Sequence, residues 1–407
     1  MFERYIFITL PQEEAPAPAG LFSLDTSLGV GSFSYGRKYL LRKNAIAIDP
    51  INLPLSNHEF TTKKNSGVFG VLGDMFPDSW GKYVLSKKLN IPFGALQPHD
   101  YFDLVTTNSV GALSVGVTPE KPTTKKETPI SFPDIKYVLD AYDRLTQDDT
   151  LPPEVLFYLE QGTSLGGAQP KCAVEYNGEE YIAKFENSKI KINMPRIEYA
   201  TMLLAQKCGI NTPTIHLEEV GNKSIYLVKR FDRHLSIRKP FISSHALSNL
   251  DLEELEKASY ISIAGHIRKI SNRVNKDIHE LYRRMAFNVF VGNADDHLRN
   301  HGCLYDNKTG WSLSPAYDIL PIPRKLPSFS SSLNIGSFGT SATIENLLSE
   351  CNKFNLSISE ASSIIEEVKT FCADWEKHYT NLGVSLHDRD QIRMCFKALV
   401  HEGLCPR

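Results

Sequence analysis

The spacing of the apolar residues changes along the chain, and this change limits the folds that the chain can adopt. Residues 1 to about 116 contain short apolar runs, such as Tyr5–Leu10 and Lys38–Leu41, separated by Gly, Pro and Asn. Such runs are typical of strands in a small sheet or partial barrel. From Leu250 onward the apolar residues recur at helical spacing, apart from one expected hairpin near Gly302–Tyr317. The sequence therefore predicts an α+β chain with a strand-rich and a helix-rich part.

Two strand pairs and one helix are expected between these parts. Cys172–Tyr176 with Tyr181–Phe185, and Thr214–Glu219 with Ser224–Lys229, each flank a turn that contains Asn and Gly. The helix is expected over Pro195–Cys208, because Pro favours the first turn of a helix and a Gly follows the last residue.

Further helices and a linker complete the domain organisation. Helices are expected on either side of a break at Pro77 within Gly67–Leu89, and over Ile135–Leu145 and Pro153–Glu160. Thr118–Pro133 is rich in Pro, Thr and Lys and has no apolar period, as expected of a linker. The expected domains are a β-rich N-terminal subdomain at 1–116, a linker at 117–134, a strand-rich lobe at 135–230 and a helical lobe at 231–407.

The composition limits the classes of function. The net charge is −2, from 45 basic and 47 acidic residues, which argues against a large surface for nucleic-acid phosphates. No stretch approaches the roughly 18 apolar residues that span a bilayer, and the N-terminus lacks the pattern of a signal peptide. The seven cysteines are scattered without a C-x-x-C pair, as expected of reduced thiols. A cytoplasmic location without membrane contact is therefore expected.

The strongest chemical pattern is VGNADDHLRN at residues 291–300, followed by an expected hairpin and Asp318. Phosphoryl transfer needs a carboxylate that accepts the proton of the attacking hydroxyl, and an amide oxygen and a second carboxylate that hold Mg²⁺. Asp295 and Asn300 have the D-x-x-x-x-N spacing of a protein-kinase catalytic loop, whereas Asp296 is one residue too close to Asn300. The alternative is a surface loop with solvated acids.

The same loop has a rival interpretation as a transition-metal site. His297 and His301 are four residues apart, and Cys303 follows them. On a helix the two histidines would share a face, as zinc ligands often do. However, no Glu follows His297 as in H-E-x-x-H, and the segment around His301 has the composition of a helix end. The phosphoryl-transfer interpretation is therefore preferred.

A glycine-containing stretch, TSLGGAQPK at Thr163–Lys171, is the second pattern. Its two glycines allow backbone N–H groups to approach phosphate oxygens, although an ordinary glycine turn fits the stretch equally well. The second strand after it contains Lys184 in Y-I-A-K, similar to the V-A-I-K strand whose Lys holds ATP phosphates. Glu198 on the next helix is the expected ion-pair partner of Lys184. The alternative is a lysine that faces solvent.

Lys229, Arg230 and Phe231 end the last strand of the expected strand-rich lobe. In a two-lobed kinase this segment is the hinge, where backbone groups bind the adenine edge and apolar side chains cover its faces. Phe231 fits an adenine contact and a core position between the lobes equally well. A strand-rich lobe followed by a helical lobe is the layout of protein kinases, although many other two-lobed enzymes share it.

Together these segments resemble the HipA family of bacterial toxin kinases over nearly the whole chain. The motifs that carry the resemblance are, in order, S-L-G-G-A-Q-P-K, Lys184 on its strand, K-R-F-D-R, N-A-D-D-H-L-R-N and S-P-A-Y-D-I. Phe33–Pro77 resembles the small N-terminal subdomain of this family. The resemblance implies a two-lobed kinase fold, with that extra subdomain, a β-rich N-terminal lobe and an all-helical C-terminal lobe.

The resemblance implies a role for each candidate residue, with ATP and Mg²⁺ as cofactors. Asp295 would accept the proton, and Asn300 and Asp318 would bind Mg²⁺. The residues implied to contact ATP are Gly166, Gly167, Ala168, Gln169, Pro170, Lys171, Lys184, Lys229, Arg230, Phe231, His297, Leu298, Arg299, Asn300, Tyr317 and Asp318.

The resemblance also implies regulation and a partner. In the family a serine of the glycine loop becomes phosphorylated and the loop leaves the site; Ser164 matches that position, and Thr163 is a second acceptor. A phosphate would add about −1.5 to −2 charge to a loop that cradles phosphates. The usual partner is a small helix-turn-helix antitoxin that binds operator DNA, so contact of this chain with DNA is expected to be indirect at most.

Three functions follow from these observations. The leading hypothesis is a serine/threonine kinase toxin that phosphorylates itself and a protein substrate, such as an aminoacyl-tRNA synthetase. The alternative is a catalytically degenerate kinase-fold protein that acts as a co-repressor with its DNA-binding partner. The presence of all three expected groups disfavours that alternative. A small-molecule kinase on the same fold is the third hypothesis.

Overall fold

The computed structural model describes residues 1–147, 169–186, 191–234, 237–324 and 330–399. These residues form two compact units. The first unit consists of the described residues within Met1–Lys189, Leu227–Leu252 and Cys303–Gly310. The second unit consists of those within Ile190–Tyr226, Glu253–Gly302 and Trp311–Arg407. The chain passes between the units several times, so neither unit is one stretch of sequence. The domain boundaries expected from the sequence stay a prediction.

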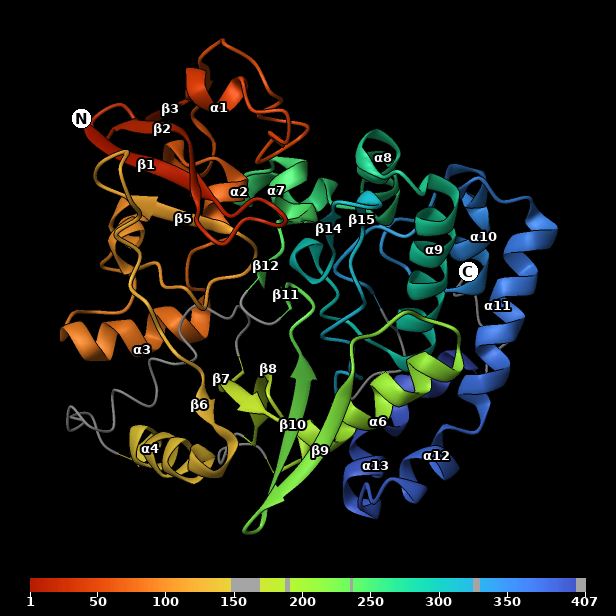
Figure 1. The fold of residues 1–407 in the computed structure, drawn as a ribbon. Helices are drawn as coiled ribbons and strands as arrows, with labels where there is room; N and C mark the ends of the chain where they lie inside the picture. Colours follow the sequence, from red (N-terminus) through yellow and green to blue (C-terminus); the bar gives the residue numbers. More distant parts are fainter. Residues whose placement is uncertain (148–168, 187–190, 235–236, 325–329, 400–407) are drawn as a thin grey trace. The chain divides into compact units, whose positions relative to one another are not determined.

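The N-terminal part of the first unit is an antiparallel sheet of five strands in the order β4-β3-β2-β1-β5 (Figure 1). The strands are β1 (Phe2–Ile8), β2 (Ala17–Asp25), β3 (Val30–Tyr35), β4 (Phe60–Thr62) and β5 (Leu113–Gly116). Phe7, Phe22 and Phe33 are fully buried and contribute to its core. The small sheet expected for this part of the chain is therefore confirmed.

One expected strand is wrong, because Lys38–Leu41 falls in and just after the short helix α1 (Arg37–Leu40). Tyr39 gives the physical reason. Its ring stacks on Tyr35 with the centroids 5.9 Å apart, and its hydroxyl donates to the carbonyl of Ile46 at 2.8 Å. A single helical turn buries Tyr39 while the charged residues before it stay exposed. An extended strand would separate these neighbours.

The rest of the first unit contains short helices and a second sheet. Its helices are α2 (Gly70–Gly73), α3 (Ser79–Leu89), α4 (Ile135–Gln147) and α7 (Ser244–Ser248). Its further strands are β6 (Ile130–Ser131), β7 (Lys171–Tyr176), β8 (Glu179–Phe185), β11 (Arg233–His234), β12 (Ile237–Arg238), β13 (Phe241–Ser243) and β14 (Gly302–Asp306), whose first residue belongs to the second unit. The helices expected within Gly67–Leu89 and from Ile135 are confirmed. Pro153–Glu160 lies outside the described residues.

The expected hairpin of β7 and β8 is confirmed. Asn177 and Gly178 join the strands, both with positive φ, as a two-residue turn of this type requires. The sheet order is β6-β7-β8-β10-β9. Strand β10 (Lys223–Lys229) pairs with β9 (Ile215–Val220) in the second unit, and its last residues belong to the first unit.

A buried charge cluster follows β10 in the first unit. Asp232 accepts hydrogen bonds from Arg230 Nη2 at 2.8 Å, from Arg233 Nη1 at 2.7 Å and from the backbone N–H of Gly111 at 2.9 Å. The guanidinium groups of this cluster also donate to carbonyls of the loop at residues 107–111. Burial opposes ionisation of Asp232, but the charges of Arg230 and Arg233 outweigh it and hold the pKa of Asp232 well below its usual value.

The second unit is mainly helical but contains strands. Its elements are α6 (Met194–Lys207), α8 (Tyr260–Ile270), α9 (Val274–Val291), α10 (Ile344–Ser349), α11 (Ile358–Ala373), α12 (Trp375–Asn381), α13 (Leu386–Ile392), β9 and β15 (Gly310–Leu313), which starts at the last residue of the first unit. Residues 231–407, which were expected to form an all-helical lobe, contain the strands β11 to β15. Helix α9 packs against α8 and α11 (Figure 1). The hairpin of β14 and β15 confirms the one expected near Gly302–Tyr317.

Helix α9 ends at a position that only glycine fits. Gly292 has φ +66°, and a Cβ atom built there would lie 2.6 Å from the carbonyl oxygen of Cys395. Both the left-handed backbone and the close contact exclude a side chain. The chain therefore leaves α9 in a sharp turn at the start of the segment that carries the candidate catalytic residues.

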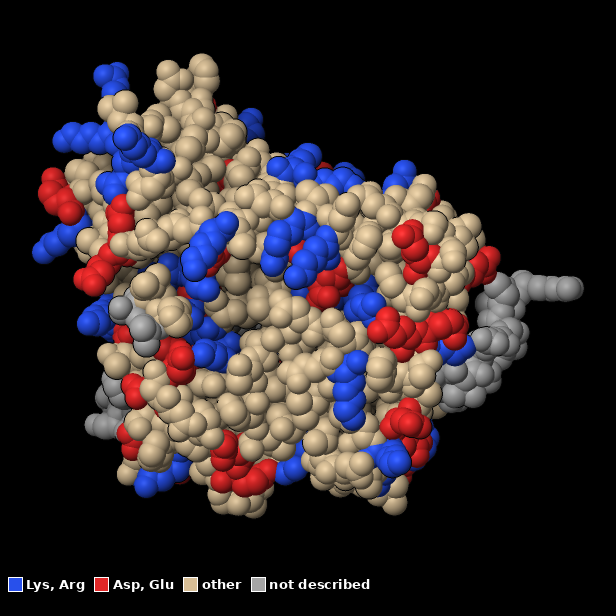
Figure 2. Space-filling model, turned by 45° about the vertical axis from the view of Figure 1, so that its right-hand side comes forward, with Lys and Arg blue, Asp and Glu red and all other residues tan. Residues whose placement is uncertain are grey.

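Charged residues of both signs occur over the face in Figure 2, in keeping with the net charge of −2. Among the helices that the structure describes, none combines the length and the apolar character that a membrane crossing requires.

We expect Asp232→Ala to lower the free energy of unfolding by about 3–5 kcal/mol, because it leaves buried guanidinium groups without their counter-charge. The matched control is Asp103→Ala, which removes a more exposed pair with Arg4 and should cost about 1 kcal/mol or less. Urea denaturation measures both. Since the folded-state pKa of Asp232 is depressed, its contribution is complete above the unfolded pKa of about 4 and is lost as pH falls below it. Equal costs for the two variants would contradict the assignment.

Candidate functional site

The loop after α9 separates two adjacent acids. Asp295 and His297 are exposed, whereas Asp296 is only 1% exposed and Asn300 is buried. A single 3-10 turn at Leu298–Asn300 closes the loop. Of the two acids, Asp295 is therefore the one whose carboxylate a substrate can reach.

One hydrogen bond orients the side-chain amide of Asn300. Its Nδ2 donates to the carbonyl oxygen of Asp295 at 3.3 Å, so the other amide atom, Oδ1, is the one left to bind a cation. Tyr317 lies just ahead of Asp318, and its hydroxyl donates to the carbonyl oxygen of Arg299 at 2.7 Å. This bond ties the segment that carries Asp318 to the loop that carries Asp295 and Asn300.

Asp318 has a strained backbone. Its φ is +60°, in the left-handed region that non-glycine residues rarely adopt, although Asp and Asn tolerate it better than most. Neighbouring backbone hydrogen bonds hold this conformation: Ala316 donates to Asn211 at 2.7 Å, and Ile322 donates to Gly292 at 3.2 Å. Such strain costs roughly 1–3 kcal/mol and is found mostly at functional sites.

Three neighbouring side chains affect the titration of Asp295. Its partial burial raises its pKa above the usual value, His297 opposes this, and the charges of Asp318 and Asp296 add to the rise. Two carboxylates that repel each other beside an amide oxygen form a set of hard oxygen ligands, which is what Mg²⁺ prefers. Within the second unit, Asn300 is thus bonded to the backbone of Asp295, and the charge of Asp318 acts on Asp295.

The rival transition-metal interpretation finds no matching cluster. His301 is buried with Nε2 at 2.9 Å from Asp296 Oδ2, while His297 is exposed. Over the described parts of the chain, no three His, Cys, Asp or Glu side chains converge as they do in a preformed metal site. An Asp–Asn–Asp set needs substrate oxygens or water to complete an octahedral shell around Mg²⁺.

Two lysines face each other in the first unit. Lys171 on β7 and Lys184 on β8 are directly paired, and they are 6% and 7% exposed. Directly paired residues share one face of a sheet, so the pair concentrates positive charge there. Just before β7, the carbonyl oxygen of Pro170 accepts from the backbone of Phe185 at 3.4 Å, and Gln169 is half-buried. The predicted residues Thr163, Ser164, Gly166, Gly167 and Ala168 lie outside the described residues.

The three predicted hinge residues have different surroundings. Lys229 Nζ lies 2.8 Å from Glu179 Oε1, and Arg230 is buried in the charge cluster around Asp232. Both side chains are thus occupied by ion pairs within the protein. Phe231 is half-buried, with its ring centroid 6.1 Å from that of Phe241. An adenine contact at this segment would therefore rest on backbone groups and Phe231.

Glu198, the expected partner of Lys184, is buried on α6 in the second unit. Burial raises the pKa of Tyr226, and the charges of Glu198 and Asp318 add to the rise. Since Lys184 belongs to the first unit, the ion pair with Glu198 stays a prediction.

The sequence analysis missed a buried network behind the loop. Tyr260 donates its hydroxyl to Asp296 Oδ2, and Asn288 Nδ2 donates to the same hydroxyl at 3.1 Å. Tyr260 stands 36 residues before Asp296, so no local pattern connects them. The available signal was Asp296 itself, an acid that the kinase spacing left without a role.

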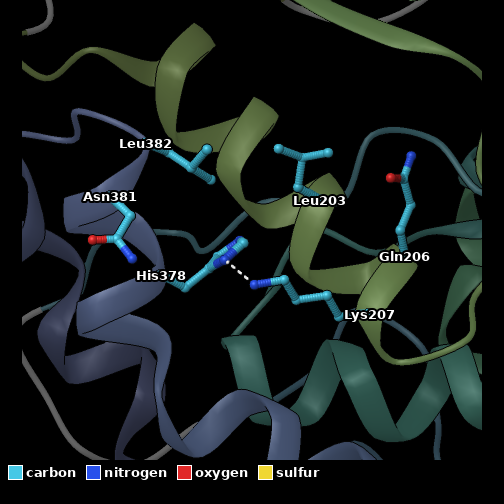
Figure 3. A pocket seen from close by; sticks show the side chains of 6 residues that line it. All are labelled: Leu203, Gln206, Lys207, His378, Asn381 and Leu382. Carbon is cyan, nitrogen blue, oxygen red and sulfur yellow. Dashed lines mark hydrogen bonds between the residues drawn. The ribbon is translucent and has the colours of Figure 1, made fainter.

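A hollow of about 430 Å³ between α6 and α12 holds none of the predicted residues (Figure 3). Its lining consists of Leu203, Gln206, Lys207, His378, Asn381 and Leu382. His378 lies 2.9 Å from Lys207 Nζ and, through Nε2, 2.9 Å from the carbonyl oxygen of Ala200. Burial lowers the pKa of His378. The hydrogen bond to Ala200 opposes this shift, and the charge of Lys207 adds to it. The lining contains no carboxylate, so it does not supply the groups that phosphoryl transfer needs.

Comparison with known proteins places this fold and these motifs in a family. Residues 163–375, more than half of the chain, match the family model of the HipA-like C-terminal domain. Y4mE of Sinorhizobium fredii, which is named as a kinase, is 25% identical over 333 residues that cover 74% of each chain. HipA of Shewanella oneidensis, named as a serine/threonine-protein kinase toxin, is 24% identical over 210 residues, which cover 43% of this chain and 47% of that protein.

A solved structure has the same fold over almost the full length. It is a chain from the complex of the Shewanella oneidensis toxin–antitoxin proteins HipA and HipB with operator DNA. It covers 97% of this chain and 96% of its own length, with a TM-score of 0.70 at 16% identity. This chain therefore belongs to the HipA family and has a mixed α+β, two-lobed, kinase-like fold.

Proposed function

We propose that this chain is an ATP- and Mg²⁺-dependent serine/threonine protein kinase. The observation that supports the proposal is an exposed Asp295 whose backbone carbonyl accepts from the Asn300 amide and whose pKa is affected by the charge of Asp318. In this proposal Asp295 accepts the proton of the acceptor hydroxyl. Asn300 and Asp318 hold Mg²⁺, which would neutralise charge on the phosphates.

The raised pKa of Asp295 suits a general base. A carboxylate with its pKa above the usual value is a stronger proton acceptor than an ordinary one. A cation held by Asn300 and Asp318 would offset the charge of Asp318 and so move the pKa of Asp295 back toward its usual value. Cation binding and proton acceptance are therefore coupled in the proposed site.

The proposal keeps the nucleotide contacts that were predicted from the sequence. Lys171 and Lys184, paired and buried on β7 and β8, would hold phosphates. The stretch Gly166–Pro170 would supply backbone donors, and residues 229–231 would contact adenine. His297, Leu298, Arg299 and Tyr317 would line the nucleotide side of the loop. Autophosphorylation is proposed at Ser164, with Thr163 as the second acceptor.

The proposed biological role is that of the toxin in a toxin–antitoxin pair. It is supported by a relative named as a serine/threonine-protein kinase toxin and by a similar fold solved with HipB and operator DNA. We propose a helix-turn-helix antitoxin as partner, with contact to DNA through that partner at most. The proposed substrate is a translation-related protein, such as an aminoacyl-tRNA synthetase.

Asp295→Asn should reduce the incorporation of label from γ-labelled ATP by about 10²–10⁴-fold, because an amide cannot accept the proton. The substitution keeps the size of the side chain, so binding of ATP with Mg²⁺ should persist. The control is Asp306→Asn, in the turn of the β14–β15 hairpin, where the carboxylate caps the backbone of Lys308. Full labelling by the Asp295 variant in a clean preparation would exclude it as the base.

Asp318→Asn and Asp318→Gly should both abolish the stimulation by Mg²⁺, with a fall in activity on the order of 10²-fold. Asn and Gly both accept the left-handed backbone at this position, so the fold should survive. Activity is measured across a Mg²⁺ titration, and thermal unfolding is measured in parallel. An unchanged Mg²⁺ requirement in stable variants would show that the metal binds elsewhere.

A bacterial lysate treated with the protein, ATP and Mg²⁺ should acquire a new phosphoserine or phosphothreonine on a protein, detected by mass spectrometry. The same lysate treated with Asp295→Asn is the control and should acquire none. A phosphorylated metabolite without a new protein site would favour a small-molecule kinase. Absence of both, together with no Mg²⁺-dependent ATP binding, would favour the co-repressor alternative.

A further inference from the structure

We propose that Asp296 is a positioning residue, which holds the loop so that Asp295 and Asn300 keep their relative placement. This inference rests on the proposed function for its effect on catalysis. Asp296 is 1% exposed, so it does not present its carboxylate to a substrate. A buried carboxylate beside an exposed one needs hydrogen bonds to offset the cost of its burial.

Asp296 has two donors from different parts of the second unit. Tyr260, the first residue of α8, donates its hydroxyl to Oδ2, and His301 Nε2 lies 2.9 Å from the same oxygen. A carboxylate accepts only, so His301 carries its proton on Nε2 in this contact. Tyr260 precedes the loop in sequence and His301 follows it, so the side chain of Asp296 is held from both sides of the loop.

The network continues into α9 and returns to the loop. Asn288 Nδ2 donates to the hydroxyl of Tyr260 at 3.1 Å, and Asn293 Nδ2 donates to Asn288 Oδ1 at 3.1 Å. These groups are all buried, where hydrogen bonds are least exchanged with water. The network thus begins at Asn293 and ends at Asp296 and His301, with Asp295 inside the span that it encloses.

Three consecutive residues of the loop are held by different bonds. Ser332 donates to the carbonyl oxygen of Ala294 at 2.6 Å, Asn300 donates to that of Asp295, and Tyr260 and His301 bind the side chain of Asp296. The backbone around Asp295 is therefore fixed while its side chain stays free to meet a hydroxyl. Displacement of a catalytic group by about 1 Å can cost on the order of 10²-fold in rate.

The test compares two buried tyrosines of the second unit. Tyr260→Phe removes the hydroxyl that binds Asp296. Tyr282→Phe removes the hydroxyl of a fully buried tyrosine on α9 that donates to the carbonyl of Leu347 at 2.9 Å. Both variants should stay folded, and Tyr260→Phe should lose more stability than Tyr282→Phe because the hydroxyl of Tyr260 binds a carboxylate. Only Tyr260→Phe should lower kcat, by about tenfold, with the KM for ATP changed by less than about threefold.

The double variant Asp296→Asn with Tyr260→Phe tests whether the two residues act through one bond. Asn at position 296 keeps the shape and loses the charge, so each single variant should lower kcat. If they act together, the double variant should be no slower than the slower single variant. Effects that multiply would overturn the proposed coupling, and an unchanged kcat in Tyr260→Phe would overturn the positioning role.

Hydrogen–deuterium exchange separates this inference from the proposed kinase activity. The peptide that spans residues 293–300 should exchange at least about tenfold faster in Tyr260→Phe than in wild type or Tyr282→Phe. This readout does not depend on catalysis. Wild-type protein without kinase activity would end the proposed function, whereas equal loop exchange in all three proteins would end the positioning role.

Discussion

The proposed site requires the second unit to hold two carboxylates, Asp295 and Asp318, although their charges repel. The protein meets this constraint through the backbone. Gly292 ends α9 in a left-handed turn that has no room for a side chain, and Asp318 also adopts a left-handed conformation. The bond from Tyr317 to the carbonyl of Arg299 links the two segments. Partial burial raises the pKa of Asp295 and the charge of Asp318 adds to the rise, a contribution that a divalent cation bound at Asp318 would oppose.

Family membership and site chemistry support different parts of the account. The family model and the shared fold show the HipA family and a kinase-like architecture, but many functions can occupy one fold. The particular residues carry the functional argument: an exposed acid, a buried acid one residue later, and an amide with its nitrogen already bonded. The two adjacent acids differ in exposure, which gives them different roles in the proposal.

Local patterns predicted the elements that local physics determines. Helix α6, the hairpin of β7 and β8 and the helical second unit follow from apolar spacing, Pro and Gly positions and an Asn-Gly turn. The prediction that Asp295, Asn300 and Asp318 form one site rests on a short loop that two of them share and on the hairpin before the third, and it stays a prediction. The strand predicted at Lys38–Leu41 was wrong, because a tertiary contact of Tyr39 outweighs strand propensity. Partners such as Tyr260 for Asp296 could not be predicted, since only the folded chain brings them together.

The most direct measurement is a crystal structure of the protein with Mg²⁺ and a non-hydrolysable ATP analogue. The account predicts Mg²⁺ at about 2.1 Å from Asn300 Oδ1 and from an Asp318 carboxylate oxygen, with Asp295 facing the terminal phosphate. A nucleotide bound without contact to these three side chains, or a metal ion held by other residues, would contradict it.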